Sequence, residues 1–124
     1  MMNEISIGES ELEIMKVLWR SPEPITSVDI GKAVEECGWK KTTIATFLVR
    51  LCEKGAVISE KQGKLYYYTA AISEKDYRRS QTRSLIRSLF GGSAKALAAS
   101  LFEDEEFSRE DIEELRAIID ETEE

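Results

Sequence analysis

The spacing of apolar residues changes at Gly55, from a helical period before it to a β period in the segment that follows it. Before Gly55, apolar residues recur every three or four positions, as in helices that bury one face, in the segments 9–20, 26–37 and 41–54. After it, the β-rich segments 56–60 and 64–69 flank a turn that contains Gly63, so they predict a hairpin. Three helices followed by a two-stranded hairpin is the order of a winged helix-turn-helix.

Three further helices are predicted after the hairpin. Ser73 and Ser108 each precede an aspartate by three positions, a pattern typical of helix N-caps, and Thr26 has the same pattern before the second helix. Gly91 and Gly92 separate the first two of the C-terminal helices. We expect these helices at 73–90, at 93–102 and from 108 onwards.

The predicted fold is mainly α with a small β-hairpin. We expect a winged helix-turn-helix DNA-binding domain at 1–72 and a helical dimerisation domain at 73–124. The second domain has more apolar residues than three helices beside a small domain can cover, so a homodimer is expected to bury them. The residues expected at the dimer interface are Leu85, Leu89, Phe90, Leu97, Leu101, Ile112, Leu115 and Ile119.

Charge is segregated along the chain, whose formal net charge is −7. Residues 1–35 carry a net charge of −4, residues 36–100 carry +7 and residues 101–124 carry −10. Proteins contact phosphates through locally basic surfaces, so the overall acidity does not exclude a DNA partner. A solvated acidic tail on a protein that binds no DNA would produce the same segregation.

The third helical segment has the two faces that a recognition helix needs. Thr42, Thr46 and Arg50 lie on one line at i, i+4 and i+8, where hydroxyl, methyl and guanidinium groups can meet bases or phosphates. Apolar residues can form the buried stripe on the other side: Ile44, Phe47, Leu48 and Leu51.

The expected DNA contacts also include the start of this helix, whose free amides suit a phosphate, and the lysines of the hairpin turn. The full set is Lys40, Lys41, Thr42, Thr43, Thr46, Arg50, Lys61 and Lys64. Ordinary solvated helix and turn surface is the alternative interpretation of these residues. Trp39 is expected in the core, and the three tyrosines at 66–68 are expected to pack in a strand.

The residue content argues against catalysis and against a metal site. The chain has no histidine and two cysteines, Cys37 and Cys52, so common acid–base groups and a histidine-containing zinc site are missing. We expect no enzyme activity, cofactor or metal, and reduced thiols, with a redox sensor as the alternative. No apolar run approaches the roughly 20 residues of a membrane-spanning helix and no signal peptide is evident, so we expect a cytoplasmic protein without direct membrane association.

Five sequence blocks occur in a fixed order over nearly the whole chain. They read IGESELEIMKVLW at 7–19, WKKTTIATFLVRL at 39–51, KG at 54–55 before the hairpin, LFGGS at 89–93 and IEEL at 112–115. Taken together, these blocks resemble the penicillinase-repressor family (BlaI/MecI/CopY).

That resemblance implies a homodimeric transcriptional repressor that binds a palindromic operator and is released by an upstream signal. In members that control β-lactam resistance, a membrane sensor-protease system leads to cleavage of an Asn-Phe bond, and this chain has Ser100-Leu101 at that position. Copper-responsive members carry a C-terminal cysteine motif, but no cysteine follows Cys52 here. Many members have Lys where Thr42 stands and a polar residue where Ala45 stands, which changes the expected operator contacts.

A winged-helix module that docks a protein and binds no DNA is the alternative function. It would be favoured if the basic residues of the third helix and of the hairpin did not share a face: Lys40, Lys41, Arg50, Lys61 and Lys64.

Overall fold

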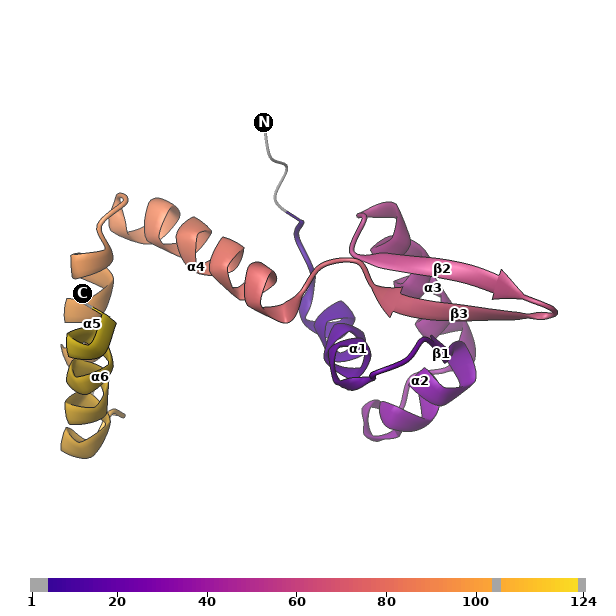
Figure 1. Ribbon diagram of the computed structural model, residues 1–124, viewed down its shortest axis with the longest axis horizontal. Helices are drawn as coiled ribbons and strands as arrows, with labels where there is room; N and C mark the ends of the chain where they lie inside the picture. Colours follow the sequence, from indigo (N-terminus) through magenta and orange to yellow (C-terminus); the bar gives the residue numbers. More distant parts are fainter. Residues whose placement is uncertain (1–4, 104–105, 123–124) are drawn as a thin grey trace. The chain divides into compact units, whose positions relative to one another are not determined.

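The computed structural model describes residues 5–103 and 106–122, with side chains described as far as 118. The chain forms two compact units, Met1–Ser80 and Gln81–Glu124. Helices dominate, and a small antiparallel sheet lies in the first unit (Figure 1), which confirms the predicted fold class. The domain boundary at 72/73 stays a prediction.

The first unit has the order of a winged helix-turn-helix, with one strand and one 3-10 turn that the sequence did not predict. Its elements are α1 (Glu9–Arg20), β1 (Ile25–Thr26), α2 (Ser27–Ala33), the 3-10 turn η1 (Glu35–Cys37), α3 (Lys41–Glu53), β2 (Val57–Gln62) and β3 (Leu65–Ala70).

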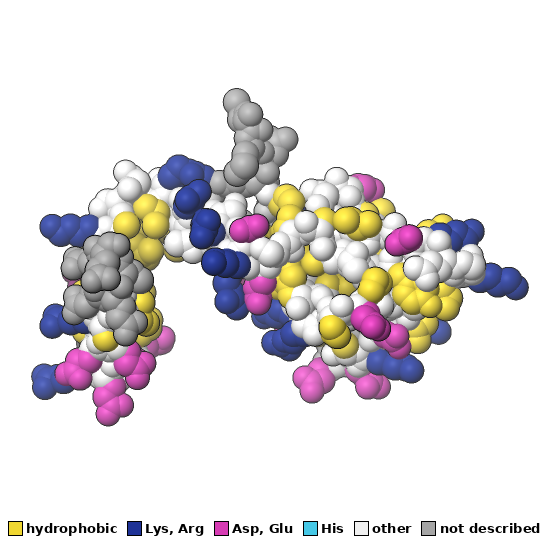
Figure 2. Space-filling model, in the orientation of Figure 1, with side chains coloured by type: hydrophobic (Ala, Val, Ile, Leu, Met, Phe, Trp, Pro, Cys, Tyr) yellow, Lys and Arg dark blue, Asp and Glu magenta, His cyan; other side chains and the backbone are white. Residues whose placement is uncertain are grey.

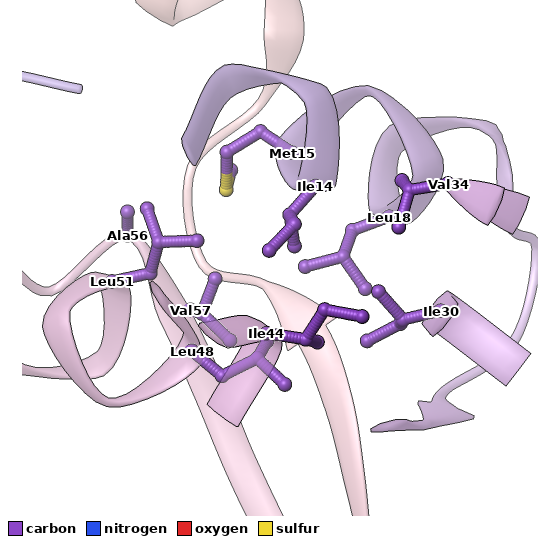
Figure 3. Close-up of a cluster of buried hydrophobic side chains, with 10 residues drawn as sticks. All are labelled: Ile14, Met15, Leu18, Ile30, Val34, Ile44, Leu48, Leu51, Ala56 and Val57. Carbon is purple, nitrogen blue, oxygen red and sulfur yellow. The ribbon is translucent and has the colours of Figure 1, made fainter. Parts of the chain in front are cut away.

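The core of this unit lies where α1, α2 and α3 meet the start of β2 (Figure 3). The helix α3 contributes Ile44, Leu48 and Leu51, which are 5%, 1% and 0% exposed. Burying one such side chain stabilises a fold by about 1.5–3 kcal/mol, so this stripe fixes which face of α3 points outward. The other core residues are Ile14, Met15, Leu18, Ile30, Val34, Ala56 and Val57.

The sheet has the order β1-β3-β2, and all its pairs are antiparallel. Gln62 pairs with Leu65, so the hairpin loop has two residues, of which Gly63 has a φ of 67°. Lys64 does not have a positive φ, and a positive φ at the first loop position only is the pattern of a type II′ turn, which matches the twist of the two strands. The pairing of Ile25 and Thr26 with β3 makes this a three-stranded sheet rather than an isolated hairpin.

Side-chain caps begin several helices where the sequence predicts them. The Thr26 hydroxyl accepts a hydrogen bond from the backbone N–H of Asp29 at 3.3 Å, and Ser73 caps α4 (Glu74–Phe90) in the same way at 3.0 Å. Ser108 and Asp111 cap each other's backbone N–H at the start of α6 (Arg109–Thr122). Helical spacing predicts one packed side of α2 with Val28, Ile30, Ala33 and Val34. Ile30 and Val34 are buried, but the prediction is wrong for Val28, which is 57% exposed, and for Ala33, which is exposed.

One buried carboxylate links the start of α1 to the end of α3. Glu11, which is 5% exposed, accepts hydrogen bonds at Oε1 from the Gly8 backbone N–H at 2.9 Å and from Lys54 Nζ at 2.5 Å. Burial alone would raise the pKa of Glu11, but these bonds and the positive charges of Lys54 and Arg50 outweigh it and lower the pKa below its ordinary 4.5. Glu11 is therefore ionised at neutral pH and holds the C-terminal end of α3 against α1.

The start of α4 is attached to α1 within the first unit. Trp19 donates a hydrogen bond from its ring nitrogen to the carbonyl of Ile72 at 2.9 Å. The same ring lies 5.8 Å, centroid to centroid, from the ring of Tyr77 in the first turns of α4. These contacts extend the first unit beyond the hairpin to Ser80.

The second unit consists of the rest of α4, α5 (Ala94–Glu103) and α6. The helices α5 and α6 are in contact through Arg116, whose guanidinium lies 5.9 Å from the ring centroid of Phe102. All the fully buried apolar residues among those described belong to the first unit, so the described side chains of α4, α5 and α6 stay at least partly exposed.

We predict that Glu11→Gln lowers the free energy of unfolding by about 1–3 kcal/mol at pH 7, because it weakens the bond to Lys54 and leaves polar groups poorly matched in a buried site. The folded-state pKa of Glu11 is below 4.5, so its contribution is present above pH 4.5 and is lost as the pH falls through the folded value. Urea unfolding at fixed protein concentration should show the difference from wild type shrinking below pH 4.5.

Glu13→Gln is the matched control for this prediction. Glu13 lies on the same helix and pairs with Lys16 at 3.2 Å, but both side chains are over 40% exposed, so its loss should change stability little. A difference between wild type and Glu11→Gln that stayed constant down to pH 3 would contradict the assigned pKa shift.

Candidate nucleic-acid interface

The outward face of α3 carries most of the residues that the sequence singles out for DNA binding. Lys41, Thr42, Thr46 and Arg50 are exposed, and Lys40 is exposed at the residue that precedes the helix. They lie opposite the buried stripe of α3, and the exposed Ala45 and 56%-exposed Val49 lie among them. Thr43 is half-buried at the edge of this face.

A hydrogen bond within α3 decides what Thr46 can offer to a ligand. Its hydroxyl donates to the backbone carbonyl of Thr42 at 3.0 Å. The donor is therefore used inside the helix, and the methyl group and the oxygen lone pairs remain for outside contacts. A methyl group suits the methyl of thymine, and a lone pair suits an amino group on a base edge.

A hollow of about 370 Å³ lies between α2 and α3. Its walls include Lys41 and Ala45 from the outward side of α3, and Val28 and Lys32 from α2. The candidate surface therefore continues from the start of α3 onto α2. The sequence missed this extension because Val28 has the helical spacing of a core residue and was placed on the packed side.

A second hollow, also about 370 Å³, connects α3 with the β2–β3 hairpin, which is the wing of this fold. Val49 of α3 and the half-exposed Tyr66 of β3 line it together. The ring of Tyr66 in turn lies 5.9 Å from the Nζ atom of Lys61 on β2. Tyr66 therefore extends the exposed side of α3 toward a cation of the wing, a cation–π contact that the sequence analysis did not predict.

Lys61 and Lys64 are exposed near the end of the wing, where Figure 2 shows Lys and Arg side chains at the tip of the hairpin. Lys61 is the second-last residue of β2, and Lys64 is the second residue of the two-residue loop. The structure places these two cations together at one end of the sheet, as the sequence predicts.

Tyr68 lines the hollow between α3 and the wing. Burial, with smaller contributions from the neighbouring Cys52 and Tyr66, raises the pKa of Tyr68 above its ordinary 10.0. The phenol of Tyr68 therefore remains protonated near the half-buried Cys52. Cys37 is exposed, and both cysteines are free thiols.

The residues expected to form a dimer are spread over α4, α5 and α6. Leu85 and Leu89 are 40% and 69% exposed. Half-buried positions include Phe90, Leu97, Leu101, Ile112 and Leu115, whereas the side chain of Ile119 lies outside the described residues. Ser100 is exposed and Leu101 is half-buried near the C-terminal end of α5, where the family resemblance predicts a cleavage site.

Among residues 5–103 and 106–122, no group of His, Cys, Asp or Glu side chains is arranged to hold a metal ion. No helix within those residues has the length and apolar character needed to cross a membrane.

Comparison with known proteins identifies relatives that match most of the chain. The family model described as "Penicillinase repressor" matches residues 7–121. The penicillinase repressor of Bacillus licheniformis is 33% identical over 115 residues, which cover 93% of this chain and 90% of that protein. The methicillin resistance regulatory protein MecI of Staphylococcus aureus (strain N315) is 27% identical over 113 residues, covering 91% and 92%.

Solved structures of BlaI match more than half of the chain. The solution structure of the DNA-binding domain of the repressor BlaI has 37% sequence identity and a TM-score of 0.54, covering 62% of this chain and 94% of that one. The Bacillus licheniformis BlaI monomer in complex with the blaP half-operator matches with the same identity and coverage and a TM-score of 0.52. The family model and the Bacillus licheniformis relative match nearly the full length of the chain, and the fold is similar to that of the BlaI domain. The chain therefore belongs to the penicillinase repressor family.

Proposed function

We propose that two copies of this chain bind a palindromic operator, with α3 of each copy in a major groove and the wing against the flanking backbone. The observation that carries this proposal is the exposed line of Thr42, Thr46 and Arg50 opposite the buried stripe of α3. Two-fold symmetry would place the two recognition helices about one helical turn of DNA apart, or a multiple of it.

As a member of the penicillinase repressor family, the chain is a DNA-binding transcriptional repressor and not an enzyme. This family membership argues against the alternative of a winged-helix module that binds only protein. The similar BlaI monomer was solved in complex with the blaP half-operator, which supports binding of this chain to operator DNA. A DNA-bound repressor acts where the chromosome lies, so a cytoplasmic location is part of the proposal.

The side chains of α3 and of the wing suit different parts of the DNA. Arg50 can form two parallel hydrogen bonds to guanine or to a phosphate. Thr46 presents its methyl group and lone pairs, because its hydroxyl hydrogen is bonded to Thr42. Lys61 and Lys64 carry flexible point charges that suit the phosphate backbone, where they add affinity without reading sequence.

The exposed apolar side chains of the second unit support a homodimer. Leu85 and Leu89 are exposed, and within the described residues this unit buries no apolar side chain fully. Large exposed apolar side chains often mark protein–protein contact sites, and a second copy would cover these. A homodimer also supplies the second half-site contact that a palindrome requires.

Release by proteolysis at Ser100-Leu101, under a membrane sensor-protease system, stays a prediction from the family resemblance. Both residues lie inside α5, which ends at Glu103. A protease binds an extended segment, so the last turn of α5 would have to unwind before this bond is cut.

We predict that Arg50→Ala and Thr46→Ala each weaken binding to an operator recovered by co-purifying genomic DNA with the repressor. Removing a base contact costs about 1–3 kcal/mol, so roughly 5- to 150-fold in affinity is expected for Arg50 if it binds guanine. A gel-shift titration at fixed salt measures this, with the exposed Lys16→Ala on α1 as the control. Unchanged affinity in both α3 variants would show that another surface reads the operator.

Substituting the lysines of the wing should affect DNA binding differently from substituting residues of α3. We expect the double substitution Lys61→Gln and Lys64→Gln to weaken operator and unrelated DNA alike, since phosphate contacts carry no sequence information. The slope of log affinity against log salt should become shallower by about 0.9 for each lost contact per half-site. An unaltered slope in fluorescence anisotropy titrations between 50 and 200 mM salt would place these lysines away from the DNA.

We predict that a chain ending at Ser80 is monomeric and binds a full operator much more weakly than the intact chain. The cut at Ser80 keeps the Trp19 contacts to Ile72 and Tyr77, so the first unit should stay folded. Sedimentation velocity measures the mass of each form, and circular dichroism checks the fold. An intact chain that sediments as a monomer at micromolar concentration would refute the dimer.

A further inference from the structure

The middle of α3 offers few hydrogen-bonding groups to the edge of a base. Between Lys41 and Arg50 the sequence is TTIATFLV, which contains no Asn, Gln, Lys, Arg, Asp or Glu. Those are the side chains that read adenine, guanine and cytosine through hydrogen bonds in the major groove. The hydroxyl hydrogen of Thr46 is also committed, because it is bonded to the carbonyl of Thr42. This part of the helix is left to distinguish bases mainly through its methyl groups.

Exposed apolar side chains lie where such polar groups are missing. Val49 is 56% exposed on the outward face of α3, the exposed Ala45 lies one turn before it, and Val28 of α2 is 57% exposed. These three side chains and the methyl group of Thr46, which follows Ala45, are called the apolar strip below. Apolar side chains that are exposed together often mark a binding surface.

The two hollows beside α3 border the apolar strip. Val28 and Ala45 both line the hollow between α2 and α3, together with the buried Ile44 and the half-buried Trp39. Val49 lines the hollow between α3 and the wing. The walls of both hollows therefore give the strip room to receive small apolar groups from outside.

Cations lie at the outer limits of the same surface. Lys32 and Lys41 line the hollow between α2 and α3. On the other side, Lys61 lies 5.9 Å from the ring of Tyr66, which lines the second hollow. Lysines suit the phosphates of a duplex, which flank its grooves. A duplex held by these outer cations would place its base edges, rather than its phosphates, against the strip.

Thymine is the base whose major-groove edge fits such a strip. Its C5 methyl group is the apolar group that distinguishes it there, whereas the other bases present donors or acceptors. Contact between this methyl group and a valine or alanine removes apolar surface from water on both sides. An amino group of cytosine or a carbonyl of guanine in the same place would lose water without gaining a partner, which costs free energy.

We propose that the apolar strip reads the operator through thymine methyl groups, with Val28 and Ala45 on one methyl group and Val49 on a second. This inference rests on the proposed binding of α3 in a major groove and specifies what the helix reads there. Ala45 and Val49 are one turn apart, about 6 Å along the axis, and base pairs are about 3.4 Å apart. The two thymines should therefore lie within about two base-pair steps of each other.

Deoxyuridine tests this proposal, because it differs from thymidine by the C5 methyl group alone and forms the same base pair. Each thymine of an operator recovered with the full-length repressor is replaced in turn, and affinity is measured by fluorescence anisotropy at fixed salt. Two thymines in each half-site should be sensitive, with about fourfold weaker binding for each methyl group lost. Replacement of the other thymines should leave the affinity unchanged.

Two variants assign each methyl group to its side chain. Val28→Thr and Val49→Thr keep the shape of valine and replace one methyl group by a hydroxyl at an exposed position. Each should weaken binding to the unmodified operator and remove the sensitivity at one thymine, a different one for each variant. At that thymine, deoxyuridine should then change the affinity by less than about twofold, because the contact is already lost.

Ile58→Thr is the matched control, because Ile58 is also 56% exposed in the first unit. Ile58 precedes Ser59, which lines the hollow beside α3, so its side chain points to the other side of the sheet. This variant should bind like wild type and keep the full sensitivity to deoxyuridine. Arg50→Ala should weaken binding to the thymine and deoxyuridine operators by the same factor, because its contact is a separate one.

The outcomes distinguish this inference from the proposed function on which it rests. If no thymine were sensitive while Arg50→Ala still weakened binding, reading through methyl groups would be wrong and binding of the operator by α3 would stand. Sensitivity that stayed complete in both valine variants would assign the methyl groups to duplex shape or to other residues, and would overturn the inference too. A wild-type chain that prefers no operator over unrelated DNA would overturn both.

Discussion

The buried stripe of α3 is the constraint on which the rest of the first unit depends. Ile44, Leu48 and Leu51 can enter the core in one rotation of the helix only, and this rotation turns Thr42, Thr46 and Arg50 outward. The stripe fixes rotation about the helix axis but controls sliding along the axis less tightly. Glu11 adds that second restraint, because its carboxylate binds Lys54 at the C-terminal end of α3. Apolar packing and one buried charge thus restrain different motions of the same helix.

Local patterns in the sequence predicted most of the elements. The helices, the wing and the caps at Thr26, Ser73 and Ser108 follow from periodicity and from residues three positions apart. The strand β1 was missed because two residues after a proline show no alternation, and it exists through its pairing with Tyr67 and Tyr68 of β3. The family resemblance supplied the function, which local patterns alone left open between DNA and protein binding.

The candidate site also has features that the sequence predicts and features that it does not. The outward line of α3 was predictable because a helix has one period and its apolar residues mark the buried side. The contact of Glu11 with Lys54 was not, since it joins positions 43 residues apart. The link from Val49 through Tyr66 to Lys61 also depends on how the sheet packs against α3. Val28 was misplaced because helical spacing alone does not say which neighbour covers a face.

The fixed register of the wing limits how a repressor of this shape can evolve. Gln62 pairs with Leu65 around a two-residue loop, and successive side chains in each strand point to opposite sides of the sheet. Adding one residue to each strand would carry the lysines of the tip to the other side, whereas adding two would bring them back. The reach of the wing therefore grows in steps of about 7 Å, which is roughly two base-pair steps of a duplex.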